Sequence, residues 1–157
     1  RELAAADFVA AVLPLVEGRL DRSLSEDERA TLAEIAPLVQ ERAKLLTEAA
    51  PQVMFLFGDI EYDEASWSKV MTKEGAADAV AGAAARLAAV EDWSIESVEA
   101  ALRQMLADLE LSARKGLQPL RVAVSGSSVS PPLFESIAAL GKECALERLE
   151  AAKARMR

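Results

Sequence analysis

Two neighbouring segments in the last third of the chain combine positive charge with a helix start. Residues 114–121 read RKGLQPLR, in which three cations lie on either side of a Gly and a Pro that indicate a turn. Residues 130–135 read SPPLFE, a pattern that predicts Ser130 as a helix N-cap with Pro131 at the first helical position. The free amides of a helix N-terminus attract anions, so this region can hold a phosphate while side chains touch unstacked bases. The alternative is an ordinary loop followed by an ordinary capped helix.

A second polar group, at residues 59–64, has the side chains to bind a divalent metal. Asp59, Glu61, Asp63 and Glu64 offer the carboxylate oxygens that hard cations prefer. The group lacks the regular ligand spacing and the glycine of an EF-hand loop, which favours a solvated loop with a helix cap. Residues 125–128, which read SGSS, lack the lysine and the glycine pattern of a P-loop. We therefore expect neither a metal site nor a nucleotide site.

The absence of histidine and the single cysteine exclude several catalytic chemistries. There is no imidazole base, no Ser-His-Asp relay, no internal disulfide and no cysteine-cluster zinc site. Cys144 lies in a helical pattern and is interpreted as a packing residue. Trp67 and Trp93 are interpreted in the same way, although an exposed aromatic ring can stack on a base. This cysteine usage is typical of a reducing compartment and predicts a cytoplasmic protein.

Charge is distributed unevenly along the 157 residues, whose net charge is −8 and whose pI is about 4.7. Residues 1–111 contain 10 basic and 22 acidic side chains, whereas residues 112–157 contain 8 basic and 4 acidic ones. Because the local electrostatic field determines which ions a surface attracts, the last third of the chain is the part that favours contact with a phosphate backbone. The alternative is a helical tail with solvated cations. The change in charge predicts two subdomains, 1–111 and a basic 112–157.

No apolar run approaches the roughly 20 residues of a membrane span, so we expect no membrane partner. The chain starts with Arg1-Glu2-Leu3, which is neither an initiator Met nor a signal peptide. We expect it to be part of a longer protein.

The spacing of apolar residues predicts an all-α fold of two packed helical subdomains. Ser25 and Glu28 form a capping box, Asp63 is placed to cap a short helix, and Ser94 is placed to cap a helix that runs to about residue 111. Residues 75–90 form an alanine-rich helix. Pro14 and Pro37 lie inside helical patterns and are expected to kink or break them. Residues 120–124 are the one strand-like run, and they fit the end of a short buried helix equally well.

Several of these segments together resemble one protein family. Residues 118–126 (QPLRVAVSG), 130–135 (SPPLFE) and 140–143 (LGKE) closely resemble the C-terminal end of bacterial glutamyl-tRNA synthetases. Residues 55–63 and 95–102 resemble the same family in the same order, so the resemblance covers nearly the whole chain. It implies a helical anticodon-binding region. The chain contains neither the HIGH-type nor the KMSKS-type ATP-binding signature, and by itself is not expected to activate glutamate.

The resemblance also implies roles for individual residues. Arg121 matches an arginine near the anticodon, and Ser130 and Leu133 match positions that contact its first base; Ser130 replaces a threonine of some members but keeps the hydroxyl. A further family arginine reads the third anticodon base, and its counterpart is Arg42 or Lys44. An arginine fork donates two hydrogen bonds to a base edge, whereas a lysine is a single point charge. The candidate tRNA-binding residues are Arg121, Ser130, Pro131, Leu133, Arg42, Lys44 and Lys115.

The leading hypothesis is an anticodon-recognition module of a glutamate-tRNA ligase. This module binds tRNA(Glu) and, if the third anticodon base is not read, also tRNA(Gln). The resemblance implies that the parent enzyme uses ATP and Mg²⁺. We expect this chain itself to hold no cofactor and to be a monomer. The alternative is a helical protein-interaction domain whose acidic 1–111 face docks a basic partner. A small-molecule enzyme is a distant third, because no nucleophile and base can be paired.

Overall fold

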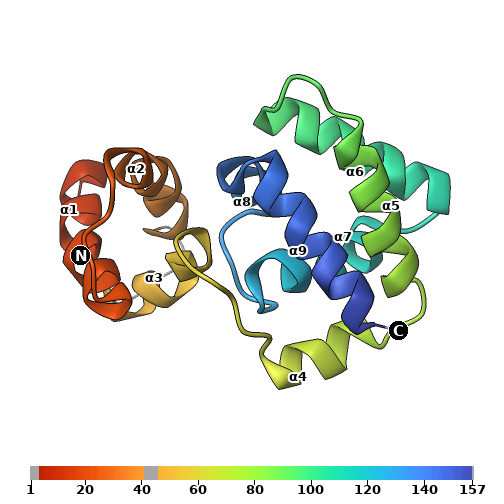
Figure 1. Ribbon diagram of the computed structural model, residues 1–157, viewed down its shortest axis with the longest axis horizontal. Helices are drawn as coiled ribbons and strands as arrows, with labels where there is room; N and C mark the ends of the chain where they lie inside the picture. The colour runs from red at the N-terminus through yellow and green to blue at the C-terminus, as the bar shows by residue number, and fades with distance from the viewer. Residues whose placement is uncertain (1–3, 41–45, 157) are drawn as a thin grey trace.

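The computed structural model describes residues 4–40 and 46–156, and all regular structure in these ranges is helical, as predicted (Figure 1). The elements are α1 (Ala5–Leu20), α2 (Glu26–Gln40), α3 (Leu46–Val53), the 3₁₀ turn η1 (Met54–Leu56), α4 (Glu64–Ser66), the π-helix η2 (Trp67–Met71), α5 (Ala76–Ala88), α6 (Ile95–Leu109), α7 (Ala113–Ser125), α8 (Leu133–Leu140) and α9 (Lys142–Arg155).

Buried apolar side chains form two separate cores. The first core joins α1, α2 and α3 through residues such as Val12, Ile35 and Val39, and the second joins η2 and α5–α9 through residues such as Leu102 and Leu120. Figure 1 shows the two groups of helices side by side, with the chain after η1 crossing between them. Helix α8 links the groups because it packs on α2 as well as on its own neighbours. The all-α fold class is thus confirmed, and the helices form two packed groups.

The predicted caps form in the structure. The amide of Glu28 donates to the Ser25 hydroxyl at 3.1 Å and the Glu28 carboxylate accepts from the Ser25 amide at 3.0 Å, which makes the capping box. Asp63 accepts the amide of Ser66 at 2.9 Å, and Ser94 accepts the amide of Ser97 at 3.1 Å. These side chains satisfy amides that the first turn of each helix leaves without a partner.

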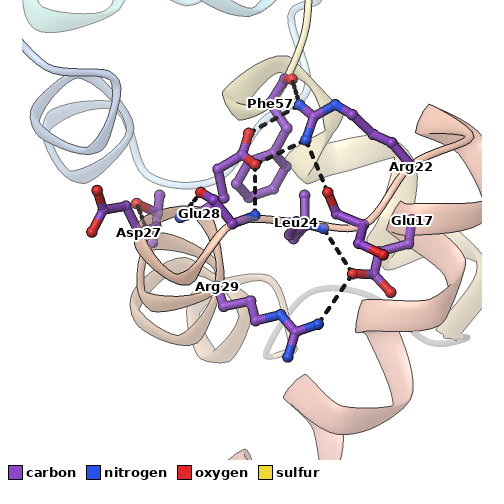
Figure 2. Close-up of polar contacts among 10 residues, drawn as sticks. Glu17, Arg22, Leu24, Asp27, Glu28, Arg29 and Phe57 are labelled. Atoms are coloured by element: carbon purple, nitrogen blue, oxygen red, sulfur yellow. Dashed lines mark hydrogen bonds and ion pairs between the residues drawn. The ribbon is translucent and has the colours of Figure 1, made fainter.

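A polar cluster fixes the turn between α1 and α2, as Figure 2 shows. Arg22 donates to both carboxylate oxygens of Glu28, at 2.9 and 3.0 Å, and to the carbonyl of Phe57 at 2.8 Å. Glu17 accepts the amide of Leu24 at 2.8 Å and pairs with Arg29 at 3.6 Å. The hydrogen bonds from Arg22 and then from the backbone of Ser25 lower the pKa of Glu28 to about 2. The cluster therefore ties the α1–α2 turn to the end of η1.

The predicted turn at residues 114–121 is wrong, and the helices do not break at Pro14 or Pro37. Residues 114–121 form no turn: Gly116 and Pro119 both lie inside α7, and the strand-like residues 120–124 are its last turns. Pro14 and Pro37 lie inside α1 and α2 without ending either helix. In each helix the buried face runs past the proline, so apolar packing compensates for the missing backbone hydrogen bond.

The predicted cap of α8 is also wrong. This helix begins at Leu133 with Pro132 at its N-cap, two residues later than the Ser130-Pro131 pattern predicts. The Ser130 hydroxyl accepts from Arg121 and donates to the carbonyl of Pro131, so it does not bind a helix amide. Ser136 instead donates to the carbonyl of Pro132 at 2.8 Å. A long-range contact with Arg121 has replaced the local capping interaction.

The second core includes side chains from both sides of the position between residues 111 and 112. The division into 1–111 and 112–157 follows the charge of the chain, and we keep it as a proposal about surface charge rather than about packing.

None of the helices in residues 4–40 and 46–156 combines the length and the apolar character that a membrane span requires.

Candidate nucleic-acid interface

Arg121 holds the loop of residues 126–132, which follows its own helix, α7. From the last turns of α7 its Nη1 donates to the Ser130 hydroxyl at 2.6 Å and to the Pro131 carbonyl at 2.8 Å. Its Nε donates to the side-chain oxygen of Gln118, one turn earlier, at 3.2 Å. Ser130 is only 3% exposed, so these bonds form in a largely desolvated place where charge-assisted hydrogen bonds are strong. The structure thus brings together Arg121, Ser130 and Pro131, which the sequence places nine and ten residues apart.

A cleft of about 520 Å³ opens beside this contact, and we call it the loop cleft. It lies between α7 and the loop, and it is lined by Ala113, Arg114, Leu117, Gln118, Arg121, Ser128, Val129 and Ser130. Val129 lines this cleft with an apolar side chain that is 65% exposed. An apolar side chain next to amide, hydroxyl and guanidinium groups suits the face and edge of an unstacked base.

Pro131 and Leu133 do not line the loop cleft. Both residues are buried, and Leu133 is 5% exposed within the second core. Pro131 contributes its carbonyl to Arg121 and Ser136, while the Leu133 side chain anchors the first turn of α8. In this conformation they support the loop from beneath.

A second cleft, of about 630 Å³, lies on the neighbouring side of α7, and we call it the lysine cleft. Its lining is Lys69, Val70, Lys73, Glu74, Arg114, Lys115, Gln118 and Pro119, so it shares Arg114 and Gln118 with the loop cleft. Lys115, a sequence-predicted site residue, is exposed here. Sequence reasoning missed Lys69 and Lys73, whose only signal was a four-residue spacing after the helix that Asp63 caps.

Residues from the segment between the two cores support the far side of the loop. The Ser66 hydroxyl donates to Asp63 at 2.7 Å and accepts the amide of Ser128 at 3.2 Å. The hydrogen bonds from Ser66 lower the pKa of Asp63. The amide of Asp63 donates to the carbonyl of Gly126 at 2.8 Å. The loop is therefore held by α7 on one side and by residues 63–66 on the other.

Gly126 allows this close approach. Its φ is +85°, in the region that favours glycine, and a Cβ built there would lie 2.3 Å from the carbonyl oxygen of Glu61. No larger residue fits without moving one of the two segments.

The remaining candidate groups have structural contacts. Asp63 is an N-cap, and Glu64 pairs with Arg155 at 3.1 Å. Cys144 is half-buried. Within residues 4–40 and 46–156, no group of three or more His, Cys, Asp or Glu side chains is arranged to hold a metal ion. Arg42 and Lys44, the candidates for reading the third base, lie outside the described residues.

Comparison with known proteins places this arrangement in a family. Residues 7–153 match the family described as anticodon binding domain. The chain belongs to this family. The residues that match this anticodon binding domain family extend across both cores and both clefts.

Curated relatives of this anticodon binding domain are glutamate-tRNA ligases. The chain is 42% identical over 156 residues to the glutamate-tRNA ligase of Saccharopolyspora erythraea, covering 96% of this chain and 31% of that protein. It is 40% identical over 162 residues to the one from Salinispora arenicola, covering 99% and 34%. The chain thus spans about a third of the length of these relatives. The resemblance to glutamyl-tRNA synthetases is confirmed.

Solved structures share the fold. A glutamate tRNA ligase from Elizabethkingia meningosepticum superposes with a TM-score of 0.76 at 20% identity, over 95% of this chain and 30% of that one. A glutamate-tRNA synthetase from Elizabethkingia anophelis gives a TM-score of 0.75 at 19% identity, over 97% and 29%. The all-α fold of this anticodon binding domain therefore occurs in both structures.

Proposed function

We propose that this chain is the anticodon-recognition module of a glutamate-tRNA ligase and that it binds the anticodon arm of tRNA(Glu). The observation that carries the proposal is the family match over residues 7–153, which contains the loop cleft and the Arg121 contact. No observation in the described ranges favours the protein-docking alternative.

In this proposal the loop cleft receives an unstacked anticodon base. Arg121 holds Ser130 and Pro131 in place, and Leu133 fixes the helix that follows, so the loop keeps one shape before RNA arrives. A site that is ordered in advance binds more tightly because less conformational entropy is lost on binding. Val129 and the polar edge of Gln118 then contact the base, and Lys115 contacts a nearby phosphate. Arg42 or Lys44 reads the third base.

Activation and transfer of glutamate belong, in this proposal, to domains outside this chain. The relatives are named as ligases and are about three times as long as the chain, which supports this division of labour. ATP and Mg²⁺ serve the reaction of those domains, and no residue of this chain is assigned to them. We further propose that the module acts in the cytoplasm and as a monomer.

The test is binding of the 157-residue chain to tRNA(Glu) and to the same tRNA with its third anticodon base changed to that of tRNA(Gln), each at two salt concentrations. We expect binding to tRNA(Glu) that weakens as salt rises, because phosphate contacts release counterions. Weaker binding of the altered tRNA supports a discriminating module. Equal binding supports a parent that also accepts tRNA(Gln), and binding to neither tRNA contradicts the proposal.

A further inference from the structure

The basic side chains of the chain are unevenly engaged. Most of those in the described ranges have a fixed partner: Arg22, Arg29, Arg86, Arg103, Lys153 and Arg155 pair with carboxylates, and Arg121, Lys142 and Arg148 donate to carbonyl groups. Five of the described basic side chains take part in no ion pair or hydrogen bond, namely Arg19, Lys69, Lys73, Arg114 and Lys115. Four of these five line the lysine cleft.

All four cations of the lysine cleft are exposed, and one carboxylate, that of Glu74, accompanies them. Lys69 and Lys73 come from η2 and the turn after it, while Arg114 and Lys115 come from the first turn of α7, and these two elements pack against each other. Tertiary packing thus brings together cations that are more than forty residues apart in a chain of net charge −8. Like charges so placed repel one another and favour an anion between them.

The start of α7 adds to this positive field. Each of the other α-helices has an acidic residue in its first turn, for example Asp78 in α5 and Glu96 in α6. Helix α7 has none and carries Arg114 and Lys115 there instead. Cations next to the positive end of a helix dipole destabilise the helix, and a bound anion relieves that repulsion. This arrangement of charges therefore destabilises α7 in the free protein and favours the binding of an anion.

The lysine cleft shares Arg114 and Gln118 with the loop cleft. Its lining also includes Val70 and Pro119, apolar groups that suit a ribose, beside cations that suit phosphates. We propose that Lys69, Lys73, Arg114 and Lys115 form a binding site for the phosphate backbone of the RNA whose base occupies the loop cleft. This inference rests on the proposed function, and it adds Lys69 and Lys73 as RNA-contacting residues.

The double substitution Lys69→Gln with Lys73→Gln tests the site without touching the loop cleft. The matched control is Arg19→Gln with Lys153→Gln, which removes two positive charges from α1 and α9. Circular dichroism and thermal melting of both variants confirm that they fold. Binding to tRNA(Glu) and to the tRNA with the altered third base is then measured between about 50 and 200 mM salt.

We expect the Lys69/Lys73 variant to bind both tRNAs on the order of tenfold more weakly at low salt. The slope of log Kd against log salt is expected to fall by about 1.4, since a single-stranded phosphate contact contributes about 0.7. The control variant is expected to change neither quantity by a comparable amount, because its charges lie outside the cleft.

Three results would overturn the inference. If the Lys69/Lys73 variant keeps the wild-type affinity and the wild-type salt slope, these lysines do not contact the RNA. The proposed function is unaffected by that result. A loss confined to one of the two tRNAs means that the lysines read a base rather than a phosphate. If the wild-type chain binds neither tRNA, the proposed function and this inference both fail.

Discussion

Arg121 bonds to the protein's own loop, which gives it a positioning role alongside any contact with RNA. Its Nη1 donates to the Ser130 hydroxyl at 2.6 Å and to the Pro131 carbonyl at 2.8 Å. Removal of the guanidinium leaves a buried hydroxyl and a buried carbonyl with fewer partners, and this costs free energy in a desolvated place. The residue therefore matters for the shape of the loop cleft before RNA binds.

We predict that Arg121→Ala weakens binding to tRNA(Glu) by on the order of 1 to 3 kcal/mol, because it loses charge-assisted hydrogen bonds and loosens the loop. Arg121→Lys keeps the charge but not the fork, so it is expected to restore only part of the affinity. The measurement is the Kd of each folded variant. An unchanged Kd for the alanine variant would contradict the assigned role.

Gly126 gives a prediction about close backbone approach. A Cβ at this position would lie 2.3 Å from the Glu61 carbonyl oxygen, whereas at Gly75, which has nearly the same left-handed backbone conformation, the nearest atom is a side-chain carbon of Leu111 at 3.3 Å. Gly75→Ala is thus the matched control for the cost of the backbone conformation alone, about 1 kcal/mol. Gly126→Ala is expected to lower the free energy of unfolding by clearly more than this, as measured by chemical denaturation. Equal losses in the two variants would contradict the steric argument.

At the scale of the element, capping residues and partners from other elements together decide where helices begin. The α2 capping box is local, since Ser25 and Glu28 are three residues apart, and the sequence predicts it correctly. The start of α8 is not local, because Arg121 binds Ser130 and the helix begins at Leu133 instead. Local patterns are reliable where no distant side chain competes for the same group.

The α2 box also predicts a pH dependence of stability. Because Arg22 and the Ser25 amide lower the pKa of Glu28 from 4.5 to about 2, this carboxylate stabilises the fold fully above pH 4.5. The contribution is lost as pH falls from 4.5 toward 2, since the unfolded chain takes up the proton first. Glu28→Gln is therefore expected to lower the Tm by a few degrees at pH 7 and to converge with wild type near pH 2.

The matched control is Glu26→Gln, which removes a carboxylate from the same first turn of α2. It leaves the contact between Arg22 and Glu28 intact, so its effect on Tm is expected to be smaller across this pH range. A Tm difference for Glu28→Gln that persists unchanged down to pH 2 would show that the ion pair is not its cause.

The whole molecule is two cores joined by one segment and by the packing of α8 on α2. Arg148 on α9 reinforces the junction, since it donates to the carbonyl of Val124 at 2.8 Å and to that of Gly58 at 2.9 Å. Arg155 lies over the rings of Tyr62 and Trp67, at 5.0 and 4.5 Å from their centroids. These contacts fix the joining segment to the second core, where both clefts lie.

The two cores predict local differences in stability. Ile35→Ala opens a cavity in the first core and Leu102→Ala opens one in the second, each at a cost of roughly 2 to 5 kcal/mol. Ile35→Ala is expected to speed hydrogen exchange mainly in α1–α3, and Leu102→Ala mainly in α5–α9. Exchange that accelerates equally in both groups of helices would show that the cores unfold as one cooperative unit.

The sequence by itself determined the helical class, the caps at Ser25, Asp63 and Ser94, and the family, because helix periodicity, capping and motif order are all properties of residues near one another in the chain. Only the tertiary structure decided that Gly116 and Pro119 lie inside a helix, since packing of a buried face outweighs the local turn preference. It also joined Arg121 to Ser130 and set Lys69 and Lys73 beside Lys115, because the distances between residues far apart in sequence depend on how the helices pack.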